Sequence, residues 1–471
     1  MLSALFRIPW GKLLVAIAYL IAVIGVPLSV EALNYYNKAA IPGQPFEAPA
    51  YIGALPSPPT PDPTKKTAVV LSSAYGSEIT DTLPPFEIFA RSGAFNTYSV
   101  APERDVLPLG PGPVMGATSL DFVPHFSFKD YDAIVGAPPD LIVVPEFPGY
   151  APERDAAVLD WIRGHFGPRT TLLAICDGIM PVADTGLLDG HTYTTNPGDF
   201  DYAAAHAPSA TLLQNLRYVD DGSVVSSSAV ASGIDATLHV VDRFAGRKTA
   251  LDVNRQLGYT QTGWLDAPSF DPPTATRFEM GLLTGFEVRQ QLGVPVYDGV
   301  SEFGLAGLLD PEVGSTSARA FVMAPERRIV RGATGFLFVP RFTFSTVPAL
   351  DRVLVPAGTD NVARQQVLAA WSAGQGRPPA EDIYQSIGRG ESAYEATLQD
   401  LARTRSGPLA QTIADTLFYQ LGATQFAGAA WPIGDILAAA AFMLLGASVV
   451  FAVTHFNIPR RTRMRVQPQP A

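Results

Sequence analysis

The sequence has little cysteine, histidine or charge, and each shortage excludes a class of structure or function. Cys176 is the only cysteine among 471 residues, so no disulfide can form within the chain. This cysteine and the six histidines show no zinc-ligand spacing, and we therefore expect neither a metal site nor a cofactor. The net charge of −11 gives no basis for nucleic-acid binding. Charged residues make up 16% of the chain and hydrophobic residues 47%, an imbalance to which two long apolar segments contribute.

One apolar segment lies near each end of the chain. Residues 13–30 contain no charged residue and are about as long as the shortest helix that spans a ~30 Å hydrocarbon core. The second segment, residues 436–454, is followed directly by the basic cluster Arg460–Arg465. We therefore expect transmembrane helices within residues 1–32 and 432–456.

The basic residues outside these segments predict their orientation. Arg7 and Lys12 precede the first segment, and a basic tail, residues 457–471, follows the second. By the positive-inside rule, both termini are cytoplasmic and the body between the spans lies outside the cytoplasm, anchored in the lipid bilayer of the cell membrane. The alternative for the first segment is a cleaved signal peptide. The alternative for the second is a buried helix of the body.

The chain between the two segments begins with a spacer and continues as an α/β body. Residues 33–65 are dense in proline, which favours an extended, semi-rigid stalk. Continuous apolar runs at 67–73, 140–146 and 171–176 then alternate with helical patterns such as 153–166. Buried strands that alternate with helices predict a parallel sheet covered on both faces.

The body contains an internal repeat. The motif FVPHFSF at Phe122–Phe128 recurs as FVPRFTF at Phe338–Phe344. Three further pairs of similar segments follow the same order, 99–106 and 322–330, 140–146 and 351–358, and 234–258 and 394–422. We therefore expect two α/β domains, at 66–260 and 261–425, of which the second is a degenerate copy that lacks the cysteine.

The cysteine is the main candidate for chemistry. The apolar run Thr171–Ile175 stops at Cys176, and a helical pattern follows. This is the layout of a nucleophile elbow, a strand-to-helix turn that holds a thiol at the carboxyl end of a parallel sheet. The alternative is an unreactive cysteine in the core.

The stretch from Thr67 to Tyr259 resembles the ThiJ/PfpI branch of the class I glutamine amidotransferase-like superfamily. It is most similar to the domain that precedes the DNA-binding module in AraC-type regulators. The resemblance is carried by residues 81–93, 174–195 and 217–241. It implies a flavodoxin-like three-layer sandwich, in which the carboxylate of Asp81 lies against the thiol of Cys176 and tunes its reactivity.

Three residues depart from the pattern of that family. Asp177 stands where the family has a small hydroxyl residue, and its charge should disfavour a thiolate. Asn196 stands where a histidine could act as a base, and Glu146 stands where a glycine lets backbone N–H groups approach an oxyanion. We expect Asp177, Gly178, Glu146 and Asn196 to line the site.

Two functions from different classes remain open. The first is a non-catalytic or ligand-sensing module that binds a small molecule. The second is a cysteine-dependent hydrolase, hydratase or lyase that acts on a small carbonyl or amide compound. A homo-oligomer also remains open. Glu302 is expected as the counterpart of Asp81 in the second copy, and His239 as a partly buried helix residue. The other histidines of the body are expected at the surface or in loops, and these are His125, His165, His191 and His206.

Overall fold

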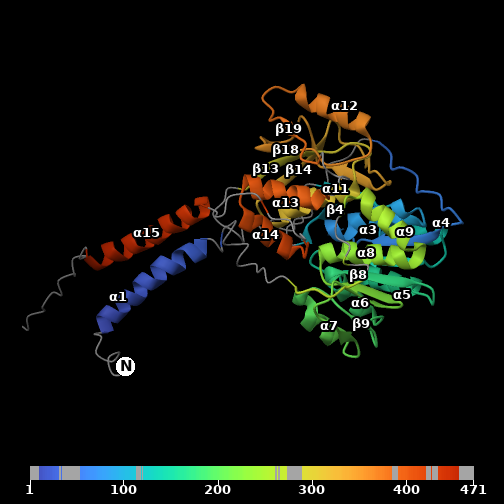
Figure 1. Ribbon diagram of the computed structural model, residues 1–471, viewed down its shortest axis with the longest axis horizontal. Helices are drawn as coiled ribbons and strands as arrows, with labels where there is room; N and C mark the ends of the chain where they lie inside the picture. Colours follow the sequence, from blue (N-terminus) through green and yellow to red (C-terminus); the bar gives the residue numbers. More distant parts are fainter. Residues whose placement is uncertain are drawn as a thin grey trace, which may run out of the picture.

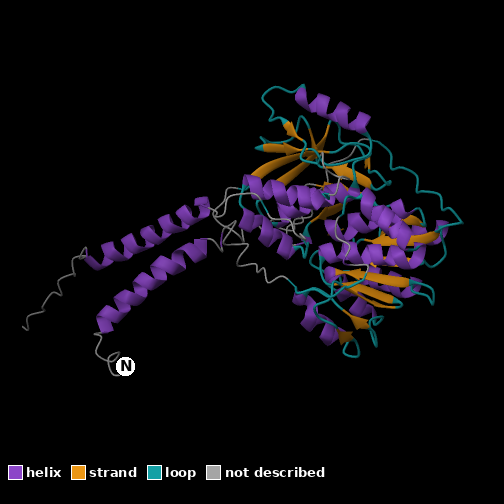
Figure 2. Cartoon of the chain, in the orientation of Figure 1, coloured by secondary structure: helices purple, strands orange, loops and turns teal. Residues whose placement is uncertain are grey.

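A computed structural model of the chain describes residues 10–30, 33, 53–112, 118, 120–259, 263, 266–272, 289–384, 391–420, 426 and 433–455. Figure 1 shows an α/β body with two long helices that extend from one side of it. In Figure 2 the strands of the body lie in separate sheets with helices packed around them. The α/β organisation expected from the sequence is therefore confirmed.

The first sheet has seven strands in the order β11-β12-β8-β7-β1-β3-β6. Its strands are β1 (Lys66–Leu71), β3 (Phe95–Ala101), β6 (Phe126–Ser127), β7 (Leu141–Val144), β8 (Thr171–Ile175), β11 (Tyr218–Asp221) and β12 (Val224–Ser227). All neighbouring pairs are parallel except β11 with β12. Every residue of β7 and β8 is buried, as expected for central strands with helices on both faces.

Alternate side chains of β1 enter two different cores. Ala68 and Val70 pack with α3 (Ile79–Ser92), α8 (Val230–Ala245) and α9 (Arg247–Gln256). Val69 and Leu71 face the opposite side, where the helices are α4 (Phe128–Ile134), α5 (Ala156–His165) and α6 (Ile179–Thr185). A short helix, α7 (Phe200–His206), and a small parallel pair, β9 (Thr192–Tyr193) and β10 (Thr211–Leu212), complete this region. The apolar runs of the sequence are therefore explained by burial on both faces of the sheet.

A second α/β region follows. Its five parallel strands, in the order β17-β14-β13-β18-β19, are β13 (Gln290–Pro295), β14 (Ala318–Ala324), β17 (Phe342–Thr343), β18 (Arg352–Leu354) and β19 (Ala380–Glu381). Its helices are α11 (Glu302–Leu309), α12 (Asn361–Ser372), α13 (Ala393–Thr404) and α14 (Gly407–Thr416). The order β17-β14-β13-β18 matches β6-β3-β1-β7 of the first region.

A third sheet joins the two regions. Its order is β15-β16-β5-β4-β2, with β2 (Ser77–Glu78), β4 (Leu107–Gly110), β5 (Leu120–Phe122), β15 (Val330–Arg331) and β16 (Leu337–Pro340). Strand β5 of the first region pairs antiparallel with β16 of the second, and Phe122 lies opposite Phe338. These are the first residues of the two FVP motifs, so the repeated segments meet each other directly. One apolar core, the one under α3 and α8, continues into the second region.

Helices α3 and α11 also connect the regions through reciprocal contacts. The Glu87 carboxylate on α3 accepts hydrogen bonds from the Ser301 hydroxyl (2.9 Å) and the Phe303 amide (2.6 Å) at the start of α11. In return, Asp310 at the end of α11 accepts a hydrogen bond from the Thr80 hydroxyl (2.6 Å) at the start of α3. Each helix therefore supplies a carboxyl group to the amino-terminal end of the other.

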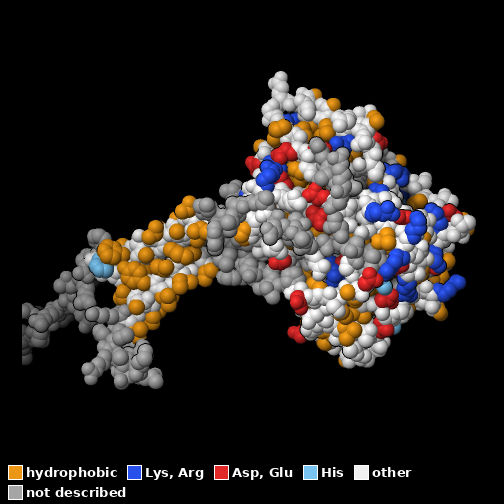
Figure 3. Space-filling model, viewed as in Figure 1, with side chains coloured by type: hydrophobic (Ala, Val, Ile, Leu, Met, Phe, Trp, Pro, Cys, Tyr) orange, Lys and Arg blue, Asp and Glu red, His pale blue; other side chains and the backbone are white. Residues whose placement is uncertain are grey.

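The two terminal helices are long and apolar enough to cross a membrane by length and composition. The first covers Leu13–Val30, which begins within α1 (Trp10–Leu20) and continues through a π-helical turn (Ile21–Gly25). The second covers Ile436–His455 within α15 (Ile433–His455). Their mean hydropathies are 2.6 and 2.5, and only 6% of each span is buried. The helices lie side by side, and Figure 3 shows apolar side chains over their visible surface. Gly446 contacts the backbone of Ala22 so closely that a side chain there would overlap it.

The described part of the expected proline-rich stalk, residues 53–65, is held against the body. Residues 53–65 lie along the body, because the Arg104 guanidinium donates to the Pro56 carbonyl and Asn96 exchanges two hydrogen bonds with the backbone of Asp62 (2.8 and 3.0 Å). Residues 34–52 lie outside the described part of the chain. So do residues 1–9, the tail 457–471 and most of the expected boundary between the two domains.

The ion pair between Asp121 and Arg341 generates a prediction about how the regions are held together. The Arg341 Nε atom lies 2.8 Å from Asp121 Oδ2, and both side chains are buried at the pairing of β5 with β16. Arg341→Met leaves the Asp121 carboxylate buried without its partner, so we expect the free energy of unfolding to fall by about 3–5 kcal/mol. Thermal unfolding of the full chain in detergent, followed by circular dichroism, measures this loss.

Arg328→Met is the matched control. Arg328 pairs with Asp298 at the surface, where both side chains are close to half exposed, so its loss should cost less than about 1 kcal/mol. The double variant Asp121→Leu with Arg341→Met should recover much of the lost stability, since it leaves no unpaired buried charge. Equal melting of Arg341→Met and Arg328→Met would contradict the buried-pair account.

Candidate functional site

Cys176 lies at a sharp turn between a strand and a helix. Strand β8 ends at Ile175, a single 3₁₀ turn covers Cys176–Gly178, and α6 begins at Ile179. The φ angle of Cys176 is +52°, a left-handed conformation that residues other than glycine seldom adopt. The turn therefore has the backbone strain and the position of a nucleophile elbow. The cysteine itself is only 4% exposed.

Gly178 lets this turn approach the neighbouring strand. A Cβ atom at Gly178 would overlap the carbonyl oxygen of Val144, the last residue of β7. With glycine there, the elbow after β8 and the segment after β7 lie against each other. This contact brings Glu146, which follows β7 closely, to the thiol.

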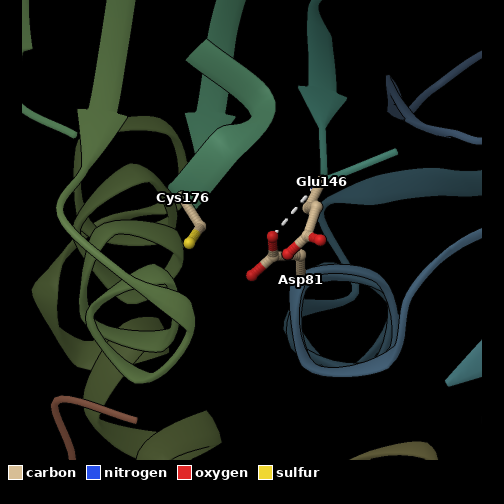
Figure 4. A group of neighbouring side chains, drawn as sticks. All are labelled: Asp81, Glu146 and Cys176. Atoms are coloured by element: carbon tan, nitrogen blue, oxygen red, sulfur yellow. Dashed lines mark hydrogen bonds between the residues drawn. The ribbon is translucent and has the colours of Figure 1, made fainter. Parts of the chain in front are cut away.

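Asp81 reaches the same place from α3. Glu78 caps this helix by accepting a hydrogen bond from the Asp81 amide (2.6 Å), which fixes Asp81 in the first turn. The Asp81 carboxylate lies between Cys176 and Glu146 (Figure 4). Its Oδ2 atom accepts a hydrogen bond from the Glu146 amide (3.0 Å), whereas Oδ1, on the side of the thiol, has no hydrogen-bond partner in the described part of the chain.

The bond from the Glu146 amide to Asp81 has a chemical consequence. An oxyanion hole needs backbone N–H groups that are free to bind the developing charge. Here the amide at the end of β7 is already bound to a carboxylate, and the Glu146 side chain adds a further acid. This strand end is therefore poorly arranged for stabilising an oxyanion.

Two polar neighbours contact the sulfur directly. The Cys176 thiol donates to Oδ1 of Asp177 (3.3 Å), and the Asn196 side-chain amide donates to the sulfur (3.5 Å). The structure thus brings together all six residues that the sequence singled out. They are Asp81, Glu146, Cys176, Asp177, Gly178 and Asn196.

Three further carboxyl groups belong to the cluster and were not predicted. Glu78 caps α3, Asp199 accepts a hydrogen bond from the Thr195 hydroxyl (3.4 Å), and Asp310 comes from the second region. Glu78 is detectable in the sequence as a helix cap three residues before Asp81. Asp310 is not, because only the packing of α11 on α3 brings it near.

Burial and mutual repulsion shift the pKa values of these groups upward. Burial first, and then the carboxylates of Asp177, Asp81 and Glu146, raises the pKa of the Cys176 thiol well above its ordinary value. Burial also raises the pKa of Asp199 to about 8, with a further contribution from Asp177, and that of Asp310 to about 6. The pKa values of Asp81 and Glu146 rise for the same reasons. A thiolate is therefore disfavoured at neutral pH.

None of the six histidines forms a hydrogen bond with the thiol or with these carboxyl groups. His239 lies partly buried on α8, as expected. His125 lies in the loop between β5 and β6, as expected, although it is only 5% exposed. Its Nδ1 atom accepts a hydrogen bond from the Ser99 amide, and its Nε2 atom lies 3.1 Å from the carbonyl oxygen of Gly335. The remaining three histidines of the body lie beside aspartates, in the pairs His165–Asp132, His191–Asp221 and His206–Asp184.

The expected role of Glu302 is not borne out. Glu302 is the first residue of α11, whereas Asp81 is the third residue of α3. The third residue of α11 is Gly304. The described part of the second region therefore has neither the thiol nor the acid that lies beside it.

Donor atoms of Asp81, Glu146 and Cys176 lie within 4.8 Å of one another. Carboxylate oxygens and a thiolate are ligands for divalent metal ions. The spacing of cysteines and histidines in the sequence could not reveal this group of three residues, because it contains one cysteine, no histidine and two carboxyl groups.

Comparison with known proteins places the first region in a family. Residues 66–243 match the DJ-1/PfpI family. Isonitrile hydratase of Pseudomonas putida is 29% identical over 167 residues, which are 35% of this chain and 68% of that protein. The Parkinson disease protein 7 homolog of Danio rerio is 25% identical over 197 residues, 41% of this chain and 96% of that protein.

The chain is also similar to solved structures, and in two of them the aligned part is nearly the whole of the solved chain. Drosophila melanogaster DJ-1beta is 16% identical, with a TM-score of 0.35, and covers 41% of this chain and 96% of its own. An AraC family transcriptional regulator from Pseudomonas putida is 15% identical, with a TM-score of 0.32, and covers 40% of this chain and 97% of its own. By the family match, and not by these structures, residues 66–243 of this chain form a domain of the DJ-1/PfpI family, within the class I glutamine amidotransferase-like proteins.

Proposed function

We propose that this chain is a membrane-anchored ligand-binding protein whose DJ-1/PfpI domain lies outside the cytoplasm and does not use Cys176 as a nucleophile. The observation that carries this proposal is the hydrogen bond from the thiol to Asp177 within a cluster of buried carboxyl groups. A thiol held in this way keeps its proton, because the thiolate would add a negative charge to a site already rich in acids.

Nucleophilic catalysis by cysteine needs a thiolate, a base that accepts the proton and a donor that stabilises the oxyanion. Asp177 and Asp81 oppose the thiolate. Asn196, in the position of the expected base, contacts the sulfur as a hydrogen-bond donor. The Glu146 amide is bound to Asp81. All three requirements are therefore poorly met, while the position of the site within the fold is retained.

We also infer that the second region is a degenerate copy of the first that now closes its site. The shared strand order and the direct pairing of the two FVP motifs support the duplication. In the first region β8 pairs with β7 on the side away from β1. In the second region β19 pairs with β18 in the corresponding place. The second region contributes Asp310 to the site, and both Asp310 and Tyr394 form hydrogen bonds with the Thr80 hydroxyl at the start of α3.

The terminal helices support anchoring by two spans. Many of their apolar side chains are not covered by the rest of the protein, for example Leu14 (62% exposed) and Leu444 (69% exposed). The contact of Gly446 with Ala22 packs the first helix against the second, which favours a retained span over a cleaved signal peptide. The basic residues at both chain ends favour cytoplasmic termini.

A second candidate function is a cysteine-dependent hydratase, hydrolase or lyase. The strained elbow and the nearby Asp81 favour it, as does the similarity to isonitrile hydratase. The two candidates differ in the reactivity of the thiol. At neutral pH, the thiol of a ligand-binding site should react slowly with an alkylating agent, whereas the thiol of an enzyme of this type should react rapidly.

The reactivity of Cys176 gives the first test of this proposal. Because it is the only cysteine, iodoacetamide labelling of the full chain in detergent, measured by intact mass, reports on this residue alone. In chelator-treated protein we expect slow alkylation at neutral pH and a rise of about tenfold per pH unit through the alkaline range, since only the thiolate reacts. Asp177→Thr should speed alkylation at neutral pH by lowering the thiol pKa.

Asp201→Thr is the matched control for this experiment. Asp201 is exposed on α7 and forms no hydrogen bond with the thiol, so its replacement should leave the rate unchanged. Rapid alkylation of the wild-type chain at neutral pH, with no acceleration in Asp177→Thr, would sink the proposal and favour the enzyme.

The orientation of the anchor gives a separate prediction. A reporter protein that is active only in the cytoplasm should be active when fused after residue 471 and silent when inserted near residue 270. Cell fractionation should recover both fusions with the membrane. Cytoplasmic activity of the reporter near residue 270 would overturn the proposed orientation.

A further inference from the structure

The three residues around the thiol come from three separate elements and converge on one point. Asp81 is on the first turn of α3, Glu146 follows β7, and Cys176 follows β8. Their donor atoms lie within 4.8 Å of one another. Ligand atoms of a tetrahedral zinc ion, at about 2.0–2.3 Å from the metal, lie roughly 3.5 Å apart. Shifts of about 1 Å in the side chains would therefore bring these donors to one ion.

A buried and unpartnered oxygen points into this group. Asp81 is fully buried, and its Oδ1 atom, on the side facing Cys176, has no hydrogen-bond partner. Glu78, which is 1% exposed and caps the same helix turn, also has an unpartnered carboxyl oxygen, Oε1. Buried polar atoms without partners are uncommon in native proteins, because each costs about 1–3 kcal/mol. An ion at this point would satisfy Asp81 Oδ1.

The charges around the group are of one sign. The groups that act electrostatically on Asp81, Glu146 and Cys176 are carboxylates, including Asp177 and Asp310. Within the described residues, no lysine, arginine or histidine forms an ion pair with any of the three. A cation that is not part of the protein would balance this charge.

The donor set favours a particular class of cation. A thiolate is a poor ligand for magnesium or calcium, whereas zinc binds both thiolate and carboxylate. Gly112 leaves room for the Glu146 carboxylate, because any side chain at position 112 would overlap Oε1 of Glu146. Three protein ligands leave a fourth position for water or for a bound molecule.

We propose that Asp81, Glu146 and Cys176 bind one Zn²⁺ ion as a three-ligand site at the carboxyl end of the first sheet. This inference rests on the proposed function, in which the site binds a ligand, and it names the class of that ligand. Binding forms a sulfur–zinc bond in place of the thiol proton, and a carboxyl ligand that carries a proton loses it in the same way; each displaced proton goes to solvent. Glu146, which stands where relatives are expected to have glycine, supplies the ligand that distinguishes this chain.

The test uses the full chain in detergent, stripped of metal with a chelator and dialysed. Titration with Zn²⁺ by calorimetry should give one site per chain. Titration with Co²⁺ should give a sulfur-to-cobalt charge-transfer absorption. Cys176→Ser should abolish that absorption, and Asp81→Asn and Glu146→Gln should each weaken Zn²⁺ binding by about tenfold or more. Glu326→Gln, at an exposed position, is the matched control and should bind as the wild type does.

Each outcome decides for or against the site. Absence of Zn²⁺ binding by the folded wild-type chain would overturn it, as would equal binding by wild type and Cys176→Ser. Displacement of Zn²⁺ by Mg²⁺ at comparable concentration would show that the ion is bound by carboxylates alone and not by the thiolate. This result would also overturn the proposed site. Circular dichroism confirms that each variant is folded. Slow alkylation of the thiol without Zn²⁺ binding would reject the metal site alone, whereas fast alkylation of the metal-free chain would reject the proposed function.

Discussion

A buried carboxyl group is stable when it is protonated, hydrogen-bonded or bound to a cation, and this site holds several such groups around one thiol. Asp177, Asp81 and Glu146 act on the thiol, and Asp310 acts on Asp81. The remaining features of the site follow from this burial. The thiol pKa is raised, the Glu146 amide is bound by Asp81, and one oxygen of Asp81 has no hydrogen-bond partner among the described residues.

The same constraint explains why the second region matters to the first. Helix α11 packs on α3, and the two helices exchange carboxyl groups through Glu87 and Asp310. This packing excludes water from the start of α3, where Asp81 lies. The antiparallel pairing of Phe122 with Phe338 and the buried Asp121–Arg341 pair hold that arrangement. The burial of the site is thus a property of both regions together.

Much of the site was predictable from sequence because it depends on local order along the chain. A strand that stops at Cys176 places the thiol at a sheet edge, and Asp81, Glu146 and Asn196 follow from the family pattern. Asp310 was not predictable, since it depends on how one region packs on the other. Glu302 was matched to Asp81 because the repeat is weak there, and only the starts of α3 and α11 show that the two residues take different places in their helices. Proline content predicts the stalk but does not reveal that Asn96 binds the backbone of Asp62 near its end.

The central claim is that the carboxyl cluster keeps the Cys176 thiol protonated. Because the chain has one cysteine, labelling with [¹³Cβ]cysteine gives a single carbon signal whose shift reports ionisation of the thiol. The measurement is a pH titration of that signal in the full, chelator-treated chain. The account predicts no titration step from acid to neutral pH and the start of ionisation only under alkaline conditions, since burial and neighbouring carboxylates raise the thiol pKa. A complete titration step below neutral pH would contradict it.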